Sequence, residues 1–224
     1  MKFFLDTASV VEIKKWQNYG LVQGATTNPT LLSKENNTTI DQLIKIASTV
    51  NGPVSAQVTY NTHEKMIIQG KALSRLSDNI VVKVPATKEG FLAAQQFVHE
   101  NINCNITLNF DPVQAIPFCL LPTSYVSLIL GREEDFGLRN LDRVQQLREI
   151  LNELKSSTKL LAASIRNPHH LISAILGKAD VITVPPSTWE NIFQNPQTLI
   201  GEKDFFDAWK TLPESLREKY ENLK

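Results

Sequence analysis

The regular alternation of short apolar runs with longer amphipathic segments is the feature that most constrains how this chain of 224 residues can fold. The apolar runs have the length of β-strands and cover residues 2–6, 22–27, 54–58, 80–84, 104–108, 124–130, 160–165 and 181–184. A helical pattern follows each run, which is typical of parallel strands covered by helices on both faces. Eight strand–helix units in this length predict a (β/α)8 TIM barrel, near the short end of its range of roughly 200 to over 400 residues.

Start signals for helices support this interpretation. Ser9 and Glu12 have the spacing of a capping box, and the segment 111–114 combines an N-cap aspartate, a proline and a capping glutamine. Asn167–Pro168 is a further N-cap and N1 pair. The alternative is a doubly wound open sheet, which usually has a glycine-rich phosphate turn after its first strand. The sequence contains neither G-x-G-x-x-G nor G-x-x-x-x-G-K.

Residues 1–224 are expected to form one domain, because no linker, low-complexity segment or charge block divides the chain. The charged, amphipathic region 203–221 follows the eighth unit and predicts a helical extension. Pro213 is expected to break or kink that helix.

The composition argues against some classes of protein. Lys+Arg and Asp+Glu both number 23, whereas nucleic-acid and membrane-surface proteins need a basic excess. The two cysteines, Cys104 and Cys119, match no metal spacing and make no disulfide framework, so we expect a reducing, cytoplasmic setting. Asp6 interrupts the first apolar run too early for a signal peptide, and no apolar stretch approaches the ~18 residues of a membrane helix.

Polar side chains stand near the C-terminal ends of seven of the eight expected strands, where a barrel builds its active site. They are Asp6, Thr27 with Asn28, Gln57, Lys83, Asn105 with Thr107, Ser127 with Arg132 beyond it, and Ser164 with Arg166. The eighth strand ends in the apolar segment 184–186. Their recurrence at equivalent strand ends favours a single site.

Each of these residues also has a structural interpretation when it is taken alone. Asn28 precedes a proline and could cap the next helix, and Asp6 could cap a turn. Gln57 could be a satisfied half-buried amide, and Arg132 could belong to a solvated charge cluster. Thr107 is a good strand former, and Ser127 and Ser164 are small residues common in strands.

Lys83 is harder to explain structurally, because it lies inside the apolar run 80–84 and lysine is rarely fully buried. Near the top of a barrel lumen its ammonium would be partly desolvated. Desolvation lowers the pKa of a lysine and makes the free amine available as a nucleophile. Such an amine forms a Schiff base with a carbonyl substrate.

The other candidate groups predict no metal site. His169 and His170 open a helix without a third ligand at a recognisable spacing, and His63 and His99 lie in expected helices. By strand parity Cys104 points away from Asn105 and is expected to pack between strand and helix.

Seven segments form a specific combination, with the pair TTNPTLL and VKVPAT as its most distinctive part. They are FLDTAS at 4–9, GATTNPTLLSKE at 24–35, VSAQV at 54–58, VVKVPATKEG at 81–90, NITL at 105–108, LGR at 130–132 and AASIRNP at 162–168. In content, order and spacing they resemble the family of small-subunit transaldolases and fructose-6-phosphate aldolases. The resemblance covers nearly the whole chain.

The resemblance implies a (β/α)8 barrel that uses a Schiff-base lysine and no metal or organic cofactor. Lys83 would attack the C2 carbonyl of a ketose phosphate, and Asp6 would be the general acid/base that removes the C4 hydroxyl proton. Thr107 and Gln57 would position a water for proton shuttling. The remaining site residues would bind the sugar phosphate: Asn28, Asn105 and Ser127 beside the bound carbons, and Arg132, Ser164 and Arg166 at the phosphate.

The implied reaction is transfer of a dihydroxyacetone unit from sedoheptulose 7-phosphate to glyceraldehyde 3-phosphate, giving erythrose 4-phosphate and fructose 6-phosphate. Two departures from the family pattern leave an alternative open. Gln57 stands where transaldolases have glutamate and aldolases have glutamine, whereas Ile129 replaces an aromatic residue that is usually tyrosine in aldolases. The alternatives are a fructose-6-phosphate aldolase that releases free dihydroxyacetone, and a non-catalytic sugar-phosphate-binding barrel.

The resemblance also implies a homo-oligomer, a pentamer or a decamer, in which the C-terminal helix reaches a neighbouring subunit. The segment 203–221 contains Phe205, Phe206 and Trp209, which suit such docking. A helix that packs on its own barrel is the alternative.

Overall fold

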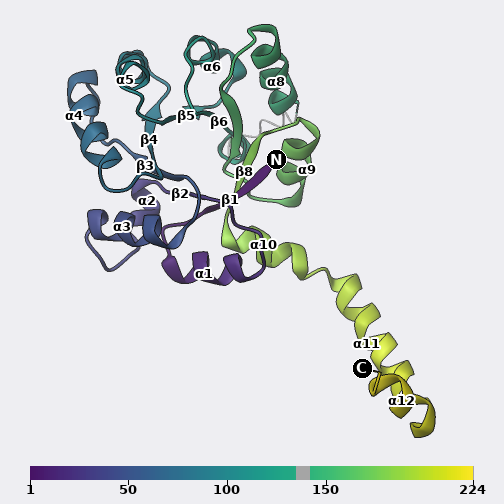
Figure 1. Cartoon of the computed structure of the whole chain (residues 1–224). Coiled ribbons are helices and arrows are strands. Elements are labelled where there is room, and N and C mark those ends of the chain that lie inside the picture. The colour runs from purple at the N-terminus through teal and green to yellow at the C-terminus, as the bar shows by residue number, and fades with distance from the viewer. Residues whose placement is uncertain (135–141, 224) are drawn as a thin grey trace. The chain divides into compact units, whose positions relative to one another are not determined.

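A computed structural model describes residues 1–134 and 142–223 of the chain (Figure 1). It contains two compact units, Met1–Thr188 and Trp189–Lys224. No helix in the described part of the chain is both long and apolar enough to span a membrane.

The first unit is a closed parallel barrel, with its strands in sequence order from β1 to β8. The strands are β1 Lys2–Asp6, β2 Ala25–Thr26, β3 Val54–Gln57, β4 Ile80–Pro85, β5 Cys104–Asn109, β6 Tyr125–Ile129, β7 Lys159–Ala163 and β8 Val181–Val184. β8 pairs with β1 in parallel, with Phe4 opposite Thr183, and this pairing closes the sheet. The predicted barrel is therefore confirmed, and the open doubly wound sheet is wrong.

Helices surround the barrel on its outer side (Figure 1). The helices up to β8 are α1 Val10–Asn18, α2 Pro29–Leu32, α3 Thr39–Thr49, α4 His63–Ser74, α5 Lys88–His99, α6 Pro112–Cys119, α7 Gly131–Glu134, α8 Arg143–Glu153 and α9 Pro168–Leu176. The capping box at Asp111 is confirmed, with both the side-chain and the backbone halves present. At α1, Ser9 accepts from the Glu12 backbone as predicted, but the Glu12 carboxylate accepts from the Trp16 indole N–H.

The second strand, Ala25–Thr26, is shorter than the predicted run 22–27. A Cβ at Gly24 would lie 2.5 Å from the ring of Phe4, so the chain enters β2 where the backbone passes directly beside an aromatic side chain. Backbone pairing continues past the end of β2, because Thr27 N–H donates to the Ser55 carbonyl at 3.1 Å.

An apolar layer fills the lower part of the barrel lumen. It consists of Phe4, Val81, Tyr125, Leu161 and Val181, each buried and each from a different strand. The rings of Phe4 and Tyr125 meet edge to face, with centroids 6.1 Å apart. Because side chains alternate along a strand, the residues two positions further on, such as Asp6, Lys83 and Thr183, share the same face above this layer.

A bulge interrupts the pairing of β5 with β6 between Ile106 and Asn109. Leu108 has φ of +64°, a left-handed conformation that a leucine adopts only under constraint. The amide of Asn109 donates to the carbonyls of Ile106 at 3.1 Å and of Ser127 at 3.0 Å. The asparagine thus satisfies backbone groups that the bulge removes from the ladder.

The segment after β8 begins with α10 Pro186–Phe193, and the second unit continues with α11 Pro196–Lys210 and α12 Glu214–Glu221. The predicted break at Pro213 is confirmed, because this residue is the N-cap of α12. Trp209 of α11 donates to Glu221 of α12 at 2.9 Å and packs on Tyr220, so the two helices contact each other. Neither helix contains a buried residue.

Candidate active site

A small polar cavity of about 90 Å³ lies above the apolar layer of the lumen. Its polar lining is Asp6, Thr26, Asn28, Gln57, Lys83, Asn105, Thr107, Ser127, Arg132, Ser164 and Thr183, and its apolar lining is Leu108, Ile129, Leu161 and Ala163. The barrel thus brings together residues from β1 to β8 and the loops that follow them, as expected for an active site at the C-terminal face.

Nearly all the residues predicted from the strand ends line this cavity. The exceptions are Thr27, whose hydroxyl donates to the Ser55 carbonyl at 2.7 Å, and Arg166. The Arg166 side chain passes over Gly131, where an added Cβ would lie 2.7 Å from two carbons of the arginine. Arg132 and Ser164 do line the cavity. Ser164 has φ of +60°, so the backbone is constrained at the strand end that delivers it.

Lys83 is held at the cavity wall by β4, between the buried residues Val82 and Val84 that face the helices. Its ammonium nitrogen donates to the carbonyl oxygen of Thr27 at 3.0 Å. Burial lowers the pKa of Lys83 below the ordinary 10.5; the Asp6 carboxylate opposes this shift, and the Arg132 charge adds to it. The amine therefore loses its proton more readily than an exposed lysine.

Asp6 is at the end of β1 and lines the same cavity. Burial raises the pKa of its carboxyl above the ordinary 3.8, against the opposing effects of the Lys83 charge, the Thr26 hydroxyl and the Arg132 charge. Thr26 donates to Asp6 Oδ1 at 3.0 Å. A carboxyl and an amine whose pKa values are displaced toward each other are suited to exchanging protons with a substrate.

Asn105 is fixed on both sides of its amide, inside the wall of the lumen. Ser127 donates to Asn105 Oδ1 at 2.6 Å, and Asn105 Nδ2 donates to Ser55 Oγ at 3.1 Å. All three residues are buried. The Ser127 hydroxyl proton is thus committed to Asn105, and the second N–H of the Asn105 amide remains for a ligand in the cavity.

Asn28 has both roles that its sequence position allowed, as the cap of a helix and as a residue of the site. Its side chain caps α2, accepting from the Leu31 N–H at 2.9 Å, and it also lines the cavity. The hydrogen bond that caps α2 therefore fixes the position of the Asn28 amide in the cavity.

The structure adds three polar residues that sequence reasoning missed: Thr26, Ser55 and Thr183. The expectation that the eighth strand brings no polar group is wrong, because Thr183 of β8 lines the cavity. Strand parity could have found it, since Thr183 lies two residues after the lumen-facing Val181. Threonine is so common in strands that its type alone gave no signal.

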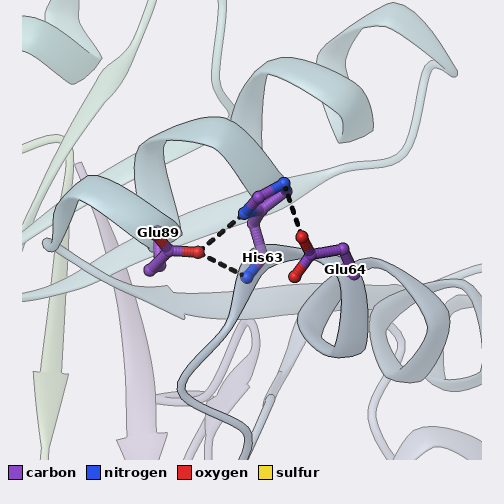
Figure 2. Close-up of side chains that lie close together, drawn as sticks. All are labelled: His63, Glu64 and Glu89. Carbon is purple, nitrogen blue, oxygen red and sulfur yellow. Dashed lines mark hydrogen bonds and ion pairs between the residues drawn. The ribbon is translucent and has the colours of Figure 1, made fainter.

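One cluster of metal-ligand types lies outside the cavity and joins α4 to α5 (Figure 2). His63 Nδ1 is 2.6 Å from a Glu89 oxygen, and His63 Nε2 is 3.3 Å from a Glu64 oxygen. Figure 2 shows that the two carboxylates approach opposite nitrogens of the ring. The geometry suits an imidazolium held between two carboxylates more than three ligands converging on one ion.

This cluster also caps a helix. Thr62, the N-cap of α4, makes no side-chain cap bond, and Glu89 of α5 accepts the His63 backbone N–H at 2.8 Å instead. The hydrogen bond to Glu89 raises the pKa of His63, and the same bond lowers the pKa of Glu89. Both shifts favour the charged forms, which is the signature of a structural ion pair.

The cysteines are free and buried. Burial raises the pKa of Cys104 to about 12 and that of Cys119 to about 11, so neither thiol forms a nucleophilic thiolate near neutral pH. Cys104 precedes Asn105 on β5 and does not line the described cavity, as its parity predicted.

Comparison with known proteins assigns the arrangement to a family. The profile of "Transaldolase/Fructose-6-phosphate aldolase" matches residues 3–223. This chain belongs to that family. A "Probable transaldolase" of Petrotoga mobilis is 39% identical over 219 residues, covering 98% of this chain and 99% of that protein. Another of Thermoplasma acidophilum is 41% identical over 214 residues, covering 94% of this chain and 96% of the relative.

A third relative, from Caulobacter sp. strain K31, has the same printed name and is 37% identical over 216 residues, covering 96% of this chain and all of its own. Among solved structures, the carboxyl transferase domain of Rhizobium etli pyruvate carboxylase superposes with a TM-score of 0.57 at 9% identity. The match covers 82% of this chain and 40% of that one. At this identity the likeness supports the barrel fold alone. The family predicted from the sequence is confirmed.

Proposed function

We propose that this transaldolase-family enzyme transfers a dihydroxyacetone unit between sugar phosphates through a Schiff base on Lys83. The observation that supports it most is the presence of Lys83 and Asp6 in one cavity, with the pKa of the lysine lowered and that of the aspartate raised by burial. The relatives named as probable transaldolases along nearly their whole length support the same reaction. The proposed substrates are sedoheptulose 7-phosphate and glyceraldehyde 3-phosphate.

The first half of the reaction breaks a carbon–carbon bond. The neutral Lys83 amine adds to the C2 carbonyl of the ketose phosphate, and loss of water gives an iminium ion. Asp6 takes the proton of the C4 hydroxyl as the C3–C4 bond breaks. The bonding electrons move into the iminium, which becomes an enamine, and the aldose phosphate leaves.

The second half reverses these steps with another aldose phosphate. The enamine carbon attacks the aldehyde of the acceptor, and Asp6 returns its proton to the new hydroxyl. Water then hydrolyses the iminium and frees Lys83. Gln57 and Thr107 line the cavity beside the lysine and are proposed to position this water.

The other predicted residues are proposed to bind the substrate. Asn28 and Asn105 present amides to the cavity, where they would hydrogen-bond the hydroxyls of the three-carbon unit. Ser127 would hold Asn105 in this orientation. Arg132 and Ser164 line the cavity and would bind the phosphate, and Arg166 would join them by moving its side chain from its place over Gly131.

Aldol cleavage of fructose 6-phosphate to free dihydroxyacetone is the second candidate function. Gln57 favours it, because it lines the cavity at the position where aldolases of the family have glutamine and transaldolases have glutamate. Ile129 disfavours it, because the apolar side chain brings no hydroxyl to the cavity where aldolases of the family usually have tyrosine.

Two measurements test the proposal. Borohydride reduction in the presence of fructose 6-phosphate should add a three-carbon unit to Lys83, detected by peptide mass spectrometry. Fructose 6-phosphate with erythrose 4-phosphate should then give sedoheptulose 7-phosphate. Stoichiometric release of free dihydroxyacetone without an acceptor would show that the enzyme catalyses aldol cleavage rather than transfer. Binding of substrate without any adduct on Lys83 would support the alternative of a non-catalytic sugar-phosphate-binding barrel.

The setting of the reaction is proposed as follows. Residues 1–224 act as one catalytic domain with the helical extension 203–221, in a cytoplasm whose reducing conditions suit the two free cysteines. A homo-oligomer, pentameric or decameric, would cover the apolar side chains exposed on α11, among which Phe205 is 80% exposed. Light scattering of the protein and of a Phe205→Ser, Phe206→Ser variant tests the assembly; equal masses with unchanged stability would contradict this docking role.

A further inference from the structure

We propose that Thr183 is a positioning residue for the acid–base group: its hydroxyl donates to Thr26 and thereby fixes the direction in which Thr26 donates to Asp6. The role rests on the proposed function of Asp6. These hydrogen bonds form a line of three side chains from different strands: Asp6 from β1, Thr26 from β2 and Thr183 from β8.

The distances and the chemistry of hydroxyls determine the direction of this line. Thr26 Oγ1 lies 3.0 Å from Asp6 Oδ1 and 2.6 Å from Thr183 Oγ1. A threonine hydroxyl has one proton to donate, and an ionised carboxylate can only accept. The Thr26 proton therefore points to Asp6, and the short contact with Thr183 requires Thr183 to be the donor.

The barrel places the line where water competes little. Thr26 is 2% exposed and Thr183 is 1% exposed. The registers put both beside β1, with Thr26 opposite Asp6 and Thr183 opposite Phe4. A buried chain of hydrogen bonds polarises its members, so a donor that itself accepts a hydrogen bond donates more strongly.

The line acts on the protonation of Asp6. A hydrogen bond donated to a carboxylate is stronger than one donated to the neutral acid, so the line favours ionised Asp6. It works together with the charges of Lys83 and Arg132, which also favour ionised Asp6, and against burial. Asp6 must be ionised to accept the C4 hydroxyl proton, and Thr183 thus serves catalysis without touching the reacting atoms.

The chain contains a matched control. Thr123 and Thr158 form another buried pair of hydroxyls, 3.1 Å apart, at the opposite end of β6 and β7. That pair ends on the carbonyl of Leu121 rather than on a carboxylate. Thr123→Val makes the same substitution as Thr183→Val in similar surroundings, with no titrating group in line.

The test is the titration of the Asp6 carboxyl carbon by ¹³C NMR, with Asp6→Asn identifying the resonance. In Thr183→Val the midpoint should rise by about 0.5 pH unit, because Thr26 becomes a weaker donor. Thr183→Ser should restore the wild-type midpoint, and Thr123→Val should leave it unchanged. If Thr183→Val does not fold, Thr183→Ala removes the same hydroxyl and is read in the same way.

An Asp6 midpoint that is unchanged or lower without the Thr183 hydroxyl would overturn the proposal. So would an equal rise in Thr123→Val. This readout does not depend on transferase activity, so a failure of the proposed reaction leaves it intact and is recognised separately by the absence of the Lys83 adduct. Where transfer is observed, kcat of Thr183→Val should fall about threefold, and the acid limb of its pH profile should move up with the midpoint.

Discussion

Two pairs of opposite charge in this barrel respond to their surroundings in opposite ways. Between Asp6 and Lys83 burial dominates, so the pKa of the acid rises, the pKa of the base falls, and both move toward their neutral forms. Between Glu89 and His63 the hydrogen bond dominates at the surface, so the pKa of the acid falls, the pKa of the base rises, and both stay charged. The direction of the shifts therefore separates a reactive pair from a structural one.

The largest expected effect is on the reactive pair itself. Lys83→Ala should abolish transfer, with a loss of at least about 10⁴-fold in kcat/KM, because no other amine replaces the nucleophile. Borohydride trapping with fructose 6-phosphate should fail in the same variant. The far-UV spectrum should be unchanged. Transfer at the wild-type rate in Lys83→Ala would show that the reaction does not pass through a Schiff base on Lys83.

Asp6→Asn should lower kcat by about 10²- to 10⁴-fold, the usual contribution of a general acid/base. The adduct on Lys83 should still form, because removing the Asp6 charge makes the lysine less basic.

The stability of this variant sharpens the comparison. A raised carboxyl pKa means that ionisation of Asp6 opposes folding at pH above its unfolded value of about 3.8.

Asp6→Asn should therefore increase the free energy of unfolding near pH 7 relative to the wild type, and this gain should disappear as the pH falls below the unfolded pKa. Urea denaturation at several pH values measures it. A variant that is less stable than the wild type at pH 7 would mean that attraction to Lys83, not burial, dominates at Asp6.

The pH dependence of Schiff-base formation comes next. Because the pKa of Lys83 lies below 10.5, the trapping rate should rise with pH and level off at a lower pH than for an exposed lysine. The rate of borohydride trapping between pH 5 and 10 gives the midpoint, after correction for the stability of the reductant. A trapping rate that still rises tenfold per pH unit up to pH 10, with no sign of levelling off, would contradict the desolvation of the amine.

The smallest effect is expected at the surface pair. Glu89→Gln should leave transfer unchanged but lower the stability slightly, because it removes the ion pair with His63 while its amide oxygen can still accept the His63 backbone N–H. The loss should be largest between the lowered pKa of Glu89 and the raised pKa of His63. It should shrink as the pH rises through the His63 value or falls through the Glu89 value.

Glu64→Gln is the matched control, since it changes only the more distant contact to His63, at 3.3 Å. Melting temperatures of both variants from pH 4 to pH 9 provide the measurement. If Glu89→Gln reduced transfer as strongly as Asp6→Asn, the division between a reactive and a structural pair would not hold.

Much of this site followed from local patterns in the sequence. Apolar runs separated by helical segments predict strands, and the polar residues at their ends, from Asp6 to Ser164, meet in one cavity because parallel strands end on one face of a barrel. Lys83 was recognisable because an ammonium in a run of valines conflicts with burial. Local patterns did not indicate three further residues of the site, because their residue types suit any strand: Thr26, Ser55 and Thr183.

Other features depend on contacts that no local pattern encodes. The hydroxyls of Thr26 and Thr183 are 2.6 Å apart although 157 positions separate them in the chain, and they meet only because β8 closes on β1. The left-handed Leu108 and the position of the Arg166 side chain over Gly131 likewise arise from neighbours on other strands and loops. The sequence by itself determined the eight strands, the helix caps and the presence of a buried amine, because each depends on residues close along the chain. Only the tertiary structure decided which hydroxyl faces which carboxylate, and how far burial moves their pKa values, because hydrogen bonding and desolvation depend on every group that surrounds an atom in space.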